Sequence, residues 1–382
     1  MLTGAAQKVY NSKERFNSLF HEGCKEEIHM TFYDVLSEKR KAVPTPDNVV
    51  DANGNAYFGT FEKEFPRMDF LKVNKPSKFP NALNKMKLTL WEAIELNLKD
   101  IIVLTAVCDM GIFGTGLTLV YDKKTKKVTK FQDMFPKSCA VISKTLLNGD
   151  TTESRGKNVV LKCVNHFEKG QALVTGHAKD EKGGNSVSYD VELNRVSLPS
   201  IVSIPFGANR PLYSQKDLFK LTGWVEFNGV RYETDEESTA IVDDHRGYYP
   251  YVAHYDWVTT MGKMEIGGER KFFGFNLTRN QSTNQNDYNE NLIWFEGKTT
   301  LLTPVRFEHP EYNKWHIRDV YGMVDITFDI GDRFIMRVPG GVIDINYHVT
   351  FGTLSGYVCD PDGNKYILDG MSGIGEDKSL RF

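Results

Sequence analysis

The stretch Asp243–Val258, DDHRGYYPYVAHYDWV, combines side chains that transfer protons with side chains that bind apolar molecules. Its sixteen residues include three carboxylates, two histidines, one arginine, four tyrosines and a tryptophan, in a chain that is 12% aromatic and 25% charged. Because folded domains bury aromatic rings and solvate charged groups, a segment rich in both is typical of a pocket lining. This segment is the strongest functional signal in the sequence.

Acid–base catalysis is the chemistry that this segment could perform. A carboxyl group buried beside tyrosines acquires a raised pKa and can deliver a proton near neutral pH. We predict that Asp244, or its neighbour Asp243, is the catalytic acid. His245 would tune the acid or relay its proton, and Tyr249 would complete the catalytic set.

Other side chains of this segment and two later regions are predicted to bind the ligand. Arg246 could hold an anionic group, and amides in the asparagine-rich run 276–291 could orient a polar head group, although most of that run is expected to be a solvated loop. A glycine-framed acid near the chain end could return to the pocket or lie in a plain terminal turn. The predicted ligand-binding residues are Arg246, Tyr248, Tyr251, His254, Asp256, Trp257, Asn276, Asn291 and Glu376.

A structural interpretation of the same residues remains open. In it, the aromatic rings fill the core, and Arg246 pairs with Asp243 or Asp244 to fasten a bend. No metal is expected, because the nine histidines lack the paired spacing of metal ligands, and no cofactor motif is found.

Strands must position these side chains. In an extended chain, successive side chains point to opposite faces, so a strand over Tyr251–Val258 would separate two sets of residues. Gly247 and Pro250 predict that Asp243–Tyr249 is a bend or bulge at a sheet end. One face would carry Tyr251, Ala253, Tyr255 and Trp257, and the other Val252, His254, Asp256 and Val258.

Antiparallel β-structure is predicted for most of the chain. Lys87–Asn97 alternates in part, Ile101–Val107 is typical of a buried strand, and Asn228-Gly229 between β-forming flanks indicates a tight hairpin. Recurrent short strands without helical segments between them favour a barrel or sandwich. We predict a helical and loop extension over 1–80, with a helix near Phe16–Phe20, a first β-barrel-like domain over 81–205 and a second over 206–382.

Composition limits the classes of partner. A net charge of −3 gives no electrostatic reason to bind nucleic acid, and no apolar run approaches the ~20 residues that span a bilayer. The five scattered cysteines fit reduced thiols in the cytoplasm better than disulfides. A small apolar or amphipathic molecule is therefore the expected partner, and the oligomeric state is left open.

The chain resembles a bacterial family known only as a domain of unknown function. The resemblance is carried by DHRGYYPYVAHYDW, GFNLTRN, NENLIWFEGK and the ending GIGEDKSLRF, and by LTLWEAIELN, CDMGIFG and LTLVYDKKTKK in the first half. More distantly, this family resembles the two-barrel lipocalin relatives that include carotenoid hydratases (hydroxyneurosporene synthases). That resemblance implies two lipocalin-like barrels, a hydrophobic ligand and an acid that protonates a double bond.

Three functions are consistent with these features. The first is a hydratase or isomerase that acts on an apolar small molecule by proton transfer. The second is a non-catalytic lipocalin-like carrier or sensor that uses the same cavity. The third is a carbohydrate-active or carbohydrate-binding β protein, whose hydrolase form needs two facing carboxylates.

Overall fold

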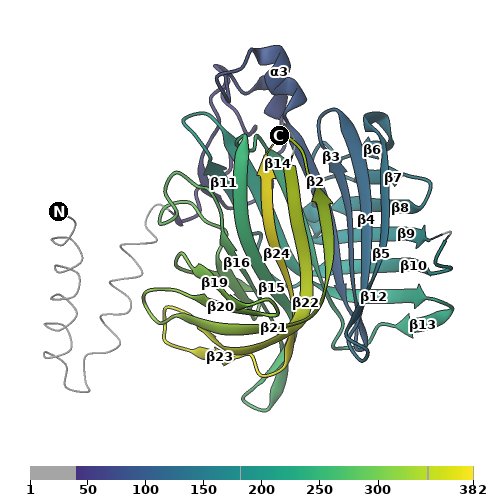
Figure 1. The fold of residues 1–382 in the computed structure, drawn as a ribbon. Helices are drawn as coiled ribbons and strands as arrows, with labels where there is room; N and C mark the ends of the chain where they lie inside the picture. The colour runs from purple at the N-terminus through teal and green to yellow at the C-terminus, as the bar shows by residue number, and fades with distance from the viewer. Residues whose placement is uncertain (1–39, 181, 342–343, 382) are drawn as a thin grey trace, which may run out of the picture.

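The computed structural model describes residues 40–180, 182–341 and 344–381. The helix predicted near Phe16–Phe20 lies outside these residues. The described chain is mostly β-strand, arranged in two antiparallel barrel-like sheets, one nearly closed and the other a half-barrel (Figure 1). The predicted fold class, mainly β with two barrel-like units, is confirmed for these residues. No described helix is long and apolar enough to cross a bilayer.

The first sheet has fourteen strands in the order β5-β4-β3-β2-β14-β12-β10-β9-β8-β7-β6, with β1, β11 and β13 attached at its side. Its strands are β1 (Gly59–Phe61), β2 (Thr89–Asn97), β3 (Ile101–Asp109), β4 (Phe113–Asp122), β5 (Lys127–Pro136), β6 (Ala140–Val141), β7 (Asp150–Arg155), β8 (Val159–His166), β9 (Gln171–Lys179), β10 (Ser186–Arg195), β11 (Ile201–Pro205), β12 (Pro211–Phe227), β13 (Val230–Glu233) and β14 (Thr239–Gly247).

The second sheet has ten strands in the order β18-β17-β16-β15-β24-β22-β21-β20-β19, with β23 paired to β22. Its strands are β15 (Val252–Ile266), β16 (Glu269–Arg279), β17 (Leu292–Phe295), β18 (Lys298–Leu301), β19 (Arg306–Glu311), β20 (Lys314–Arg318), β21 (Val324–Val338), β22 (Asp344–Cys359), β23 (Lys365–Ile367) and β24 (Met371–Arg381). The described helical elements are all short: η2 (Phe70–Lys72), α3 (Asn81–Met86), η3 (Lys137–Cys139) and η4 (Phe167–Lys169).

Strand β3 shows why the predicted Ile101–Val107 strand is apolar on both faces. Ile101 and Val103 pack inside the first sheet, whereas Ile102 and Leu104 pack in a cluster that also contains side chains of the second sheet. All nine residues of β3 are buried. A strand covered on both faces carries a continuous apolar run instead of an alternating one.

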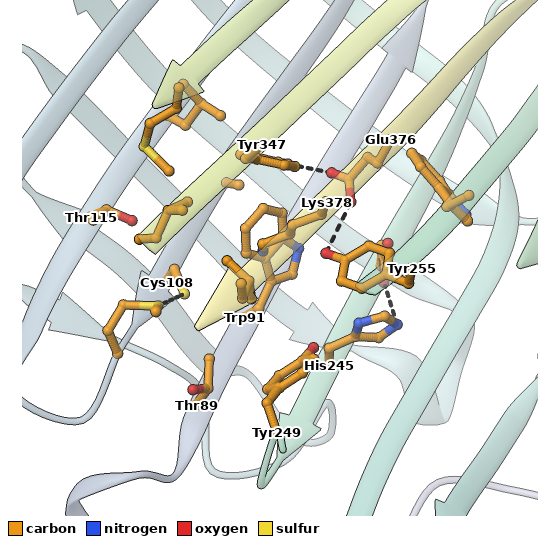
Figure 2. A pocket seen from close by; sticks show the side chains of 18 of the residues that line it. Thr89, Trp91, Cys108, Thr115, His245, Tyr249, Tyr255, Tyr347, Glu376 and Lys378 are labelled. Atoms are coloured by element: carbon orange, nitrogen blue, oxygen red, sulfur yellow. Dashed lines mark hydrogen bonds and ion pairs between the residues drawn. The ribbon is translucent and has the colours of Figure 1, made fainter. Parts of the chain in front are cut away.

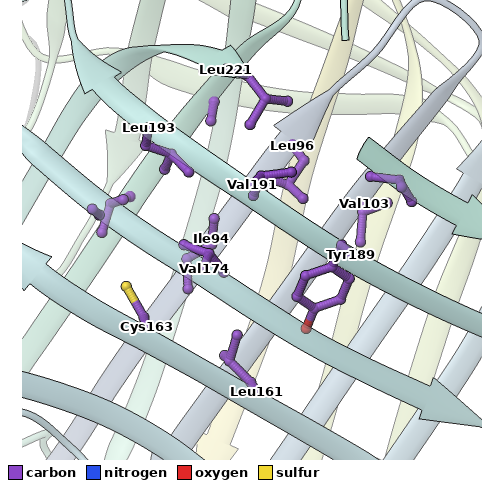
Figure 3. Close-up of a cluster of buried hydrophobic side chains, with 14 of the residues drawn as sticks. Ile94, Leu96, Val103, Leu161, Cys163, Val174, Tyr189, Val191, Leu193 and Leu221 are labelled. Atoms are coloured by element: carbon purple, nitrogen blue, oxygen red, sulfur yellow. The ribbon is translucent and has the colours of Figure 1, made fainter. Parts of the chain in front are cut away.

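The interior of the first sheet is a separate apolar core. Figure 3 shows its aliphatic side chains, with Tyr189 among them. The Tyr189 hydroxyl lies 2.9 Å from the hydroxyl of Thr105, which lies 3.0 Å from that of Thr118. These hydrogen bonds satisfy the hydroxyl group of Thr105, the polar residue within the apolar strand β3.

The Asp243–Val258 segment is the passage from the first sheet to the second. The first sheet ends at Gly247 and the second begins at Val252. The change of sheet therefore lies after the predicted domain boundary at 205/206, and the division into domains itself stays a prediction. The bend predicted for Asp243–Tyr249 is wrong over its first part, because Asp243–Gly247 pairs with both β2 and β12.

Hairpin turns were predictable from local sequence. Asn228 and Gly229 adopt φ of 52° and 78° between β12 and β13, as the predicted tight hairpin requires. Two glycines with positive φ likewise join β15 to β16.

Gly247, at the end of β14, is expected to resist substitution. A Cβ at this position would lie 2.3 Å from the carbonyl oxygen of Pro211 and 2.8 Å from Cα of Leu212. Gly247→Ala should therefore lower the free energy of unfolding by roughly 1–3 kcal/mol, because the backbone of β12 must move. Urea unfolding of the variant measures the loss. Gly207→Ala, whose Cβ would meet Arg210 at an ordinary 3.4 Å, is the control, and an equal loss there would contradict the steric explanation.

Candidate active site

A cavity of about 120 Å³ lies between the two sheets, and we call it the intersheet cavity (Figure 2). Its walls come from β2 to β5, β12 and β14 of the first sheet and from β15, β16, β21, β22 and β24 of the second. Most of the lining is apolar or aromatic. The residues used below are Trp91, Lys216, Asp243, His245, Tyr249, Tyr255, Trp257, Glu290, Tyr347, Glu376 and Lys378.

Alternation along β14 and β15 decides which residues of the Asp243–Val258 segment reach the cavity. Asp243 and His245 line it from β14, and Tyr255 and Trp257 line it from β15. The face predicted for Tyr255 and Trp257 is confirmed. Tyr249 lines the cavity from the passage between the strands, where its ring packs 6.1 Å from that of Phe206.

Five polar side chains meet at one wall, and we call them the charged cluster: Ser214, Lys216, Asp243, His245 and Glu290. Lys216 Nζ lies 2.9 Å from Asp243 Oδ2 and 3.4 Å from Glu290 Oε2. His245 Nε2 lies 2.9 Å from Ser214 Oγ, 3.2 Å from Lys216 Nζ and 3.4 Å from both carboxylates. Among the residues that the structure describes, Asp243 Oδ1 has no hydrogen-bond partner, and its ionic contact is His245 Nε2 at 3.4 Å. Because Asp243 lines the cavity, its carboxylate is a candidate proton acceptor.

Opposite charges hold Lys216 and Glu290 in their ionised forms. Burial alone would lower the pKa of Lys216, but Asp243 and Glu290 raise it above its ordinary value. Burial alone would raise the pKa of Glu290, but Lys216 and His245 hold it well below its ordinary value. Burial and the charge of Asp243 also raise the pKa of Glu95, which is 1% exposed.

The lowered pKa of Glu290 predicts a pH-dependent contribution to stability. A carboxylate with a depressed folded pKa stabilises the fold fully above its unfolded value of about 4.3, and this contribution is lost as the pH falls below that value. Glu290→Gln should cost roughly 1–3 kcal/mol at pH 7. The difference in the free energy of unfolding between the variant and the unmodified protein should shrink as the pH falls below 5.

Urea unfolding between pH 7 and pH 3 tests this expectation. Glu236→Gln is the control, because this side chain is 79% exposed and pairs with Lys220 at the surface. A Glu290→Gln deficit that stays constant over this range would show that the charge of Glu290 does not stabilise the fold.

Glu376 lies on β24, at another wall of the cavity. The Tyr347 hydroxyl donates to Glu376 Oε1, and the Tyr255 hydroxyl donates to Oε2 at 3.2 Å (Figure 2). Burial raises the pKa of Glu376, and Lys378 and the Tyr347 hydrogen bond oppose that rise only in part. Glu376 is therefore an acid that faces an apolar cavity and keeps its proton above its ordinary pH range.

Asp244, the predicted catalytic acid, lies on the opposite face of β14. Arg246 Nε and Nη2 donate to its two oxygens at 2.7 and 2.8 Å, and Asp244 is 0% exposed. Arg246 also donates to the carbonyl oxygen of Ser143, and the pair lies close to Glu92 inside the first sheet. Neither Asp244 nor Arg246 lines the intersheet cavity. The pairing is the one considered in the structural interpretation of this segment.

Four other predicted ligand-binding residues lie outside the cavity lining. The Tyr248 hydroxyl donates to the carbonyl oxygen of Phe70 at 2.9 Å, and Tyr251 is 46% exposed. Asn276 accepts a hydrogen bond from Trp257 Nε1 at 2.5 Å and donates to the Glu290 carbonyl oxygen at 2.9 Å. Asn291 bonds the Thr278 amide and the Thr303 carbonyl group. The two asparagines therefore hold the positions of residues that do line the cavity.

His254 and Asp256 lie on the face of β15 that does not line the intersheet cavity, and they form a polar cluster with Asp377. Their candidate metal-ligating atoms lie within 4.8 Å of one another. However, Arg279 Nη2 lies 2.5 Å from Asp256 Oδ2 and 2.8 Å from His254 Nε2, and His309 lies 3.4 Å from the other oxygen of Asp256. The carboxylate is thus balanced by the cationic group beside it.

Sequence reasoning missed Lys216, Glu290, Tyr347 and Lys378. Tyr347, Glu376 and Lys378 share one face of adjacent strands, since Tyr347 is the cross-strand partner of Lys378. The alternation of GIGEDKSL carried a signal for Glu376 and Lys378. The run 276–291 was expected to be mostly a solvated loop, and residues 281–288 are indeed an accessible loop. Its ends are buried, and they include Asn280, Asn289 and Glu290, which were not predicted as site residues.

Comparisons with known proteins were made for the sequence and for the fold. The family model described as "Domain of unknown function (DUF2804)" matches residues 40–382. No curated protein matches the sequence.

Several solved structures are similar to this chain over most of its length, at low sequence identity. Kievitone hydratase from Nectria haematococca is 10% identical, with a TM-score of 0.41 and coverage of 90% of this chain and 97% of that one. A protein from Nitrosomonas europaea is 13% identical, with a TM-score of 0.43 and coverage of 80% and 96%. CghA is 8% identical, with a TM-score of 0.40 and coverage of 89% and 97%.

Proposed function

The chain belongs to the DUF2804 family of unknown function, as its sequence motifs predicted, and from its site we propose that it is a proton-transfer enzyme of the hydratase or isomerase type. Its substrate is an apolar or amphipathic small molecule bound in the intersheet cavity. One observation carries this proposal. A buried acid, Glu376, and members of the charged cluster, among them Asp243 and His245, line the same largely apolar cavity.

The two polar walls suit opposite roles in acid–base catalysis. Glu376 retains its proton because burial raises its pKa, so it is the donor. Asp243 is the acceptor, because it lines the cavity and its Oδ1 has no hydrogen-bond partner in the described part of the chain. His245 contacts Asp243 and Ser214, so it can pass the accepted proton onward.

The reaction class follows from these roles. In an isomerisation, one carbon of the substrate loses a proton to Asp243, the double bond shifts, and another carbon gains the proton of Glu376. In a hydration, Glu376 protonates a double-bond carbon, and water that loses its proton to Asp243 attacks the other carbon. Trp257, Trp91 and Tyr249 provide apolar surface for the rest of the molecule.

Two measurements test the proposal. Native mass spectrometry of the purified protein identifies the small molecule that co-purifies with it. That molecule is then incubated with the protein in D₂O, and incorporation of carbon-bound deuterium is followed by mass spectrometry. Deuterium at carbon above the protein-free rate supports the enzyme. Binding without any incorporation, together with an ordinary titration of Glu376 by NMR, would instead identify a non-catalytic carrier.

A further inference from the structure

We propose that Lys378 binds an anionic oxygen of the ligand, so that the substrate is an apolar molecule carrying an enolisable carbonyl or a carboxylate group. The inference rests on the proposed function and specifies the substrate class of the same cavity. It also assigns a role to a side chain that the acid–base pair does not use.

Lys378 is surrounded by aromatic rings. Its cross-strand neighbours are Tyr255 on β15 and Tyr347 on β22. Lys378 Nζ lies 5.5 Å and 4.6 Å from the centres of these two rings and 5.2 Å from that of Trp91, which belongs to the first sheet (Figure 2). Three rings thus fix the ammonium group at the junction of the two sheets, where it lines the cavity.

The ammonium group of Lys378 forms no ion pair and no hydrogen bond with a described residue, and its contacts there are the three rings. Its charge acts on Glu376, which the proposed function takes as the protonated and therefore uncharged donor. The other lysine of the cavity, Lys216, is already neutralised by Asp243 and Glu290. An ammonium group carries three donors, and in an apolar cavity these favour an acceptor oxygen.

The sign of this charge distinguishes two kinds of intermediate. Protonation of an isolated double bond creates a carbocation, which a nearby ammonium group repels. Removal of a proton next to a carbonyl group creates an enolate, whose negative oxygen the same group attracts. The position of Lys378 therefore favours a substrate whose intermediate is anionic at oxygen.

The corresponding reaction balances with the residues present. Asp243 takes a proton from the carbon beside the carbonyl group, and the electron pair of that C–H bond moves towards oxygen and forms an enolate held by Lys378. The enolate then re-forms its carbonyl group while the conjugated double bond takes the proton of Glu376 at its far carbon. The net change is a shift of the double bond, and solvent restores both carboxyl groups.

Three small probes with one apolar chain test the inference. Octanoate, 1-octanol and octylammonium are titrated into the protein at pH 7 by calorimetry. Octanoate is expected to bind about tenfold more tightly than 1-octanol, because a hydrogen bond between charged groups is worth roughly that much more than one to a neutral hydroxyl group. Octylammonium should bind more weakly than 1-octanol.

Variants of Lys378 give the second arm of the test. Lys378→Met should abolish the preference for octanoate over 1-octanol, whereas Lys378→Arg should keep it. Lys365→Met is the matched control, since Lys365 Nζ lies 3.7 Å from the ring of Tyr357 outside the cavity and is exposed. The control should keep the full preference.

The outcomes separate this inference from the proposed function. If octanoate and 1-octanol bind the unmodified protein equally, or if Lys378→Met keeps the preference, the role of Lys378 is wrong while the cavity still binds apolar molecules. If none of the three probes binds, the apolar binding site itself is wrong, and the inference falls with it. The comparison in the unmodified protein does not depend on whether a variant folds.

Discussion

Replacing Glu376 by glutamine is expected to slow proton transfer to the bound molecule by at least about 100-fold, the usual contribution of a positioned acid. Glutamine can still bond both tyrosines that contact the two carboxyl oxygens, because its amide oxygen accepts from one hydroxyl group and its amide nitrogen donates to the other. It has no proton to give at neutral pH. The variant should therefore keep the shape of the cavity and its affinity for apolar molecules while losing turnover.

The pH dependence of the reaction gives an independent check. Burial raises the pKa of Glu376, so its protonated, active form persists above the ordinary range of a glutamate, and the rate should fall as the pH rises through this raised value. Deuterium incorporation into the co-purifying molecule, measured between pH 5 and pH 9, follows this loss.

A second buried glutamate serves as the control for Glu376. Burial and the charge of Asp244 raise the pKa of Glu92 too, but Glu92 faces the interior of the first sheet, where it bonds Thr152 and Asn165. Glu92→Gln should leave the deuterium incorporation of the folded protein within about threefold. An equal loss in both variants, or full activity in Glu376→Gln, would refute the assignment of Glu376 as the donor.

The fold was predictable because individual strands and turns have recognisable local sequence patterns. Hairpin turns such as Asn228-Gly229 need residues that tolerate positive φ, and those residues are visible in the sequence. The apolar run at Ile101–Val107 reflects burial on two faces, which no loop would produce. These are local properties, and local properties can be read from one chain without its neighbours.

The candidate site was only partly predictable, because it is built from two sheets. The sequence marked the Asp243–Val258 segment by its polar and aromatic residues. In the structure this segment crosses from one sheet to the other beside the cavity. Which of two adjacent aspartates faces the cavity depends on whether β14 continues to Gly247. The expected bend at Asp243–Tyr249 removed the alternation that would have placed Asp243 and Asp244 on opposite faces.

Residues contributed by distant strands could not be assigned. Lys216 neutralises Asp243 from β12, and Trp91 contacts Lys378 across the two sheets. Nothing near either residue in the sequence marks it as part of a site, because its partners lie far along the chain. The pairing of strands, which is a property of the whole fold, brings them together.

Arg246→Met is expected to lower the free energy of unfolding at pH 7 by about 3–5 kcal/mol, the usual cost of removing one partner of a buried ion pair. The change leaves the Asp244 carboxylate, which is 0% exposed, without its two charge-assisted hydrogen bonds, and it leaves the Ser143 carbonyl oxygen without a donor. Because an unpaired buried carboxylate can escape this cost by taking up a proton, the deficit should shrink as the pH falls.

Arg231→Met is the matched control for this variant. Arg231 also pairs with a carboxylate two residues away, Glu233, at 2.5 Å, but both side chains are about half exposed or more, and such pairs contribute at most about 1 kcal/mol. Urea unfolding at pH 7 and pH 5 measures both variants, and calorimetry with 1-octanol measures the cavity of the folded variant. Since Arg246 and Asp244 face away from the intersheet cavity, 1-octanol affinity should not change. A stable Arg246→Met variant that has lost 1-octanol binding would show that Asp244 and Arg246 contribute to the ligand site. It would contradict the assignment of these two residues to the face of β14 opposite the cavity.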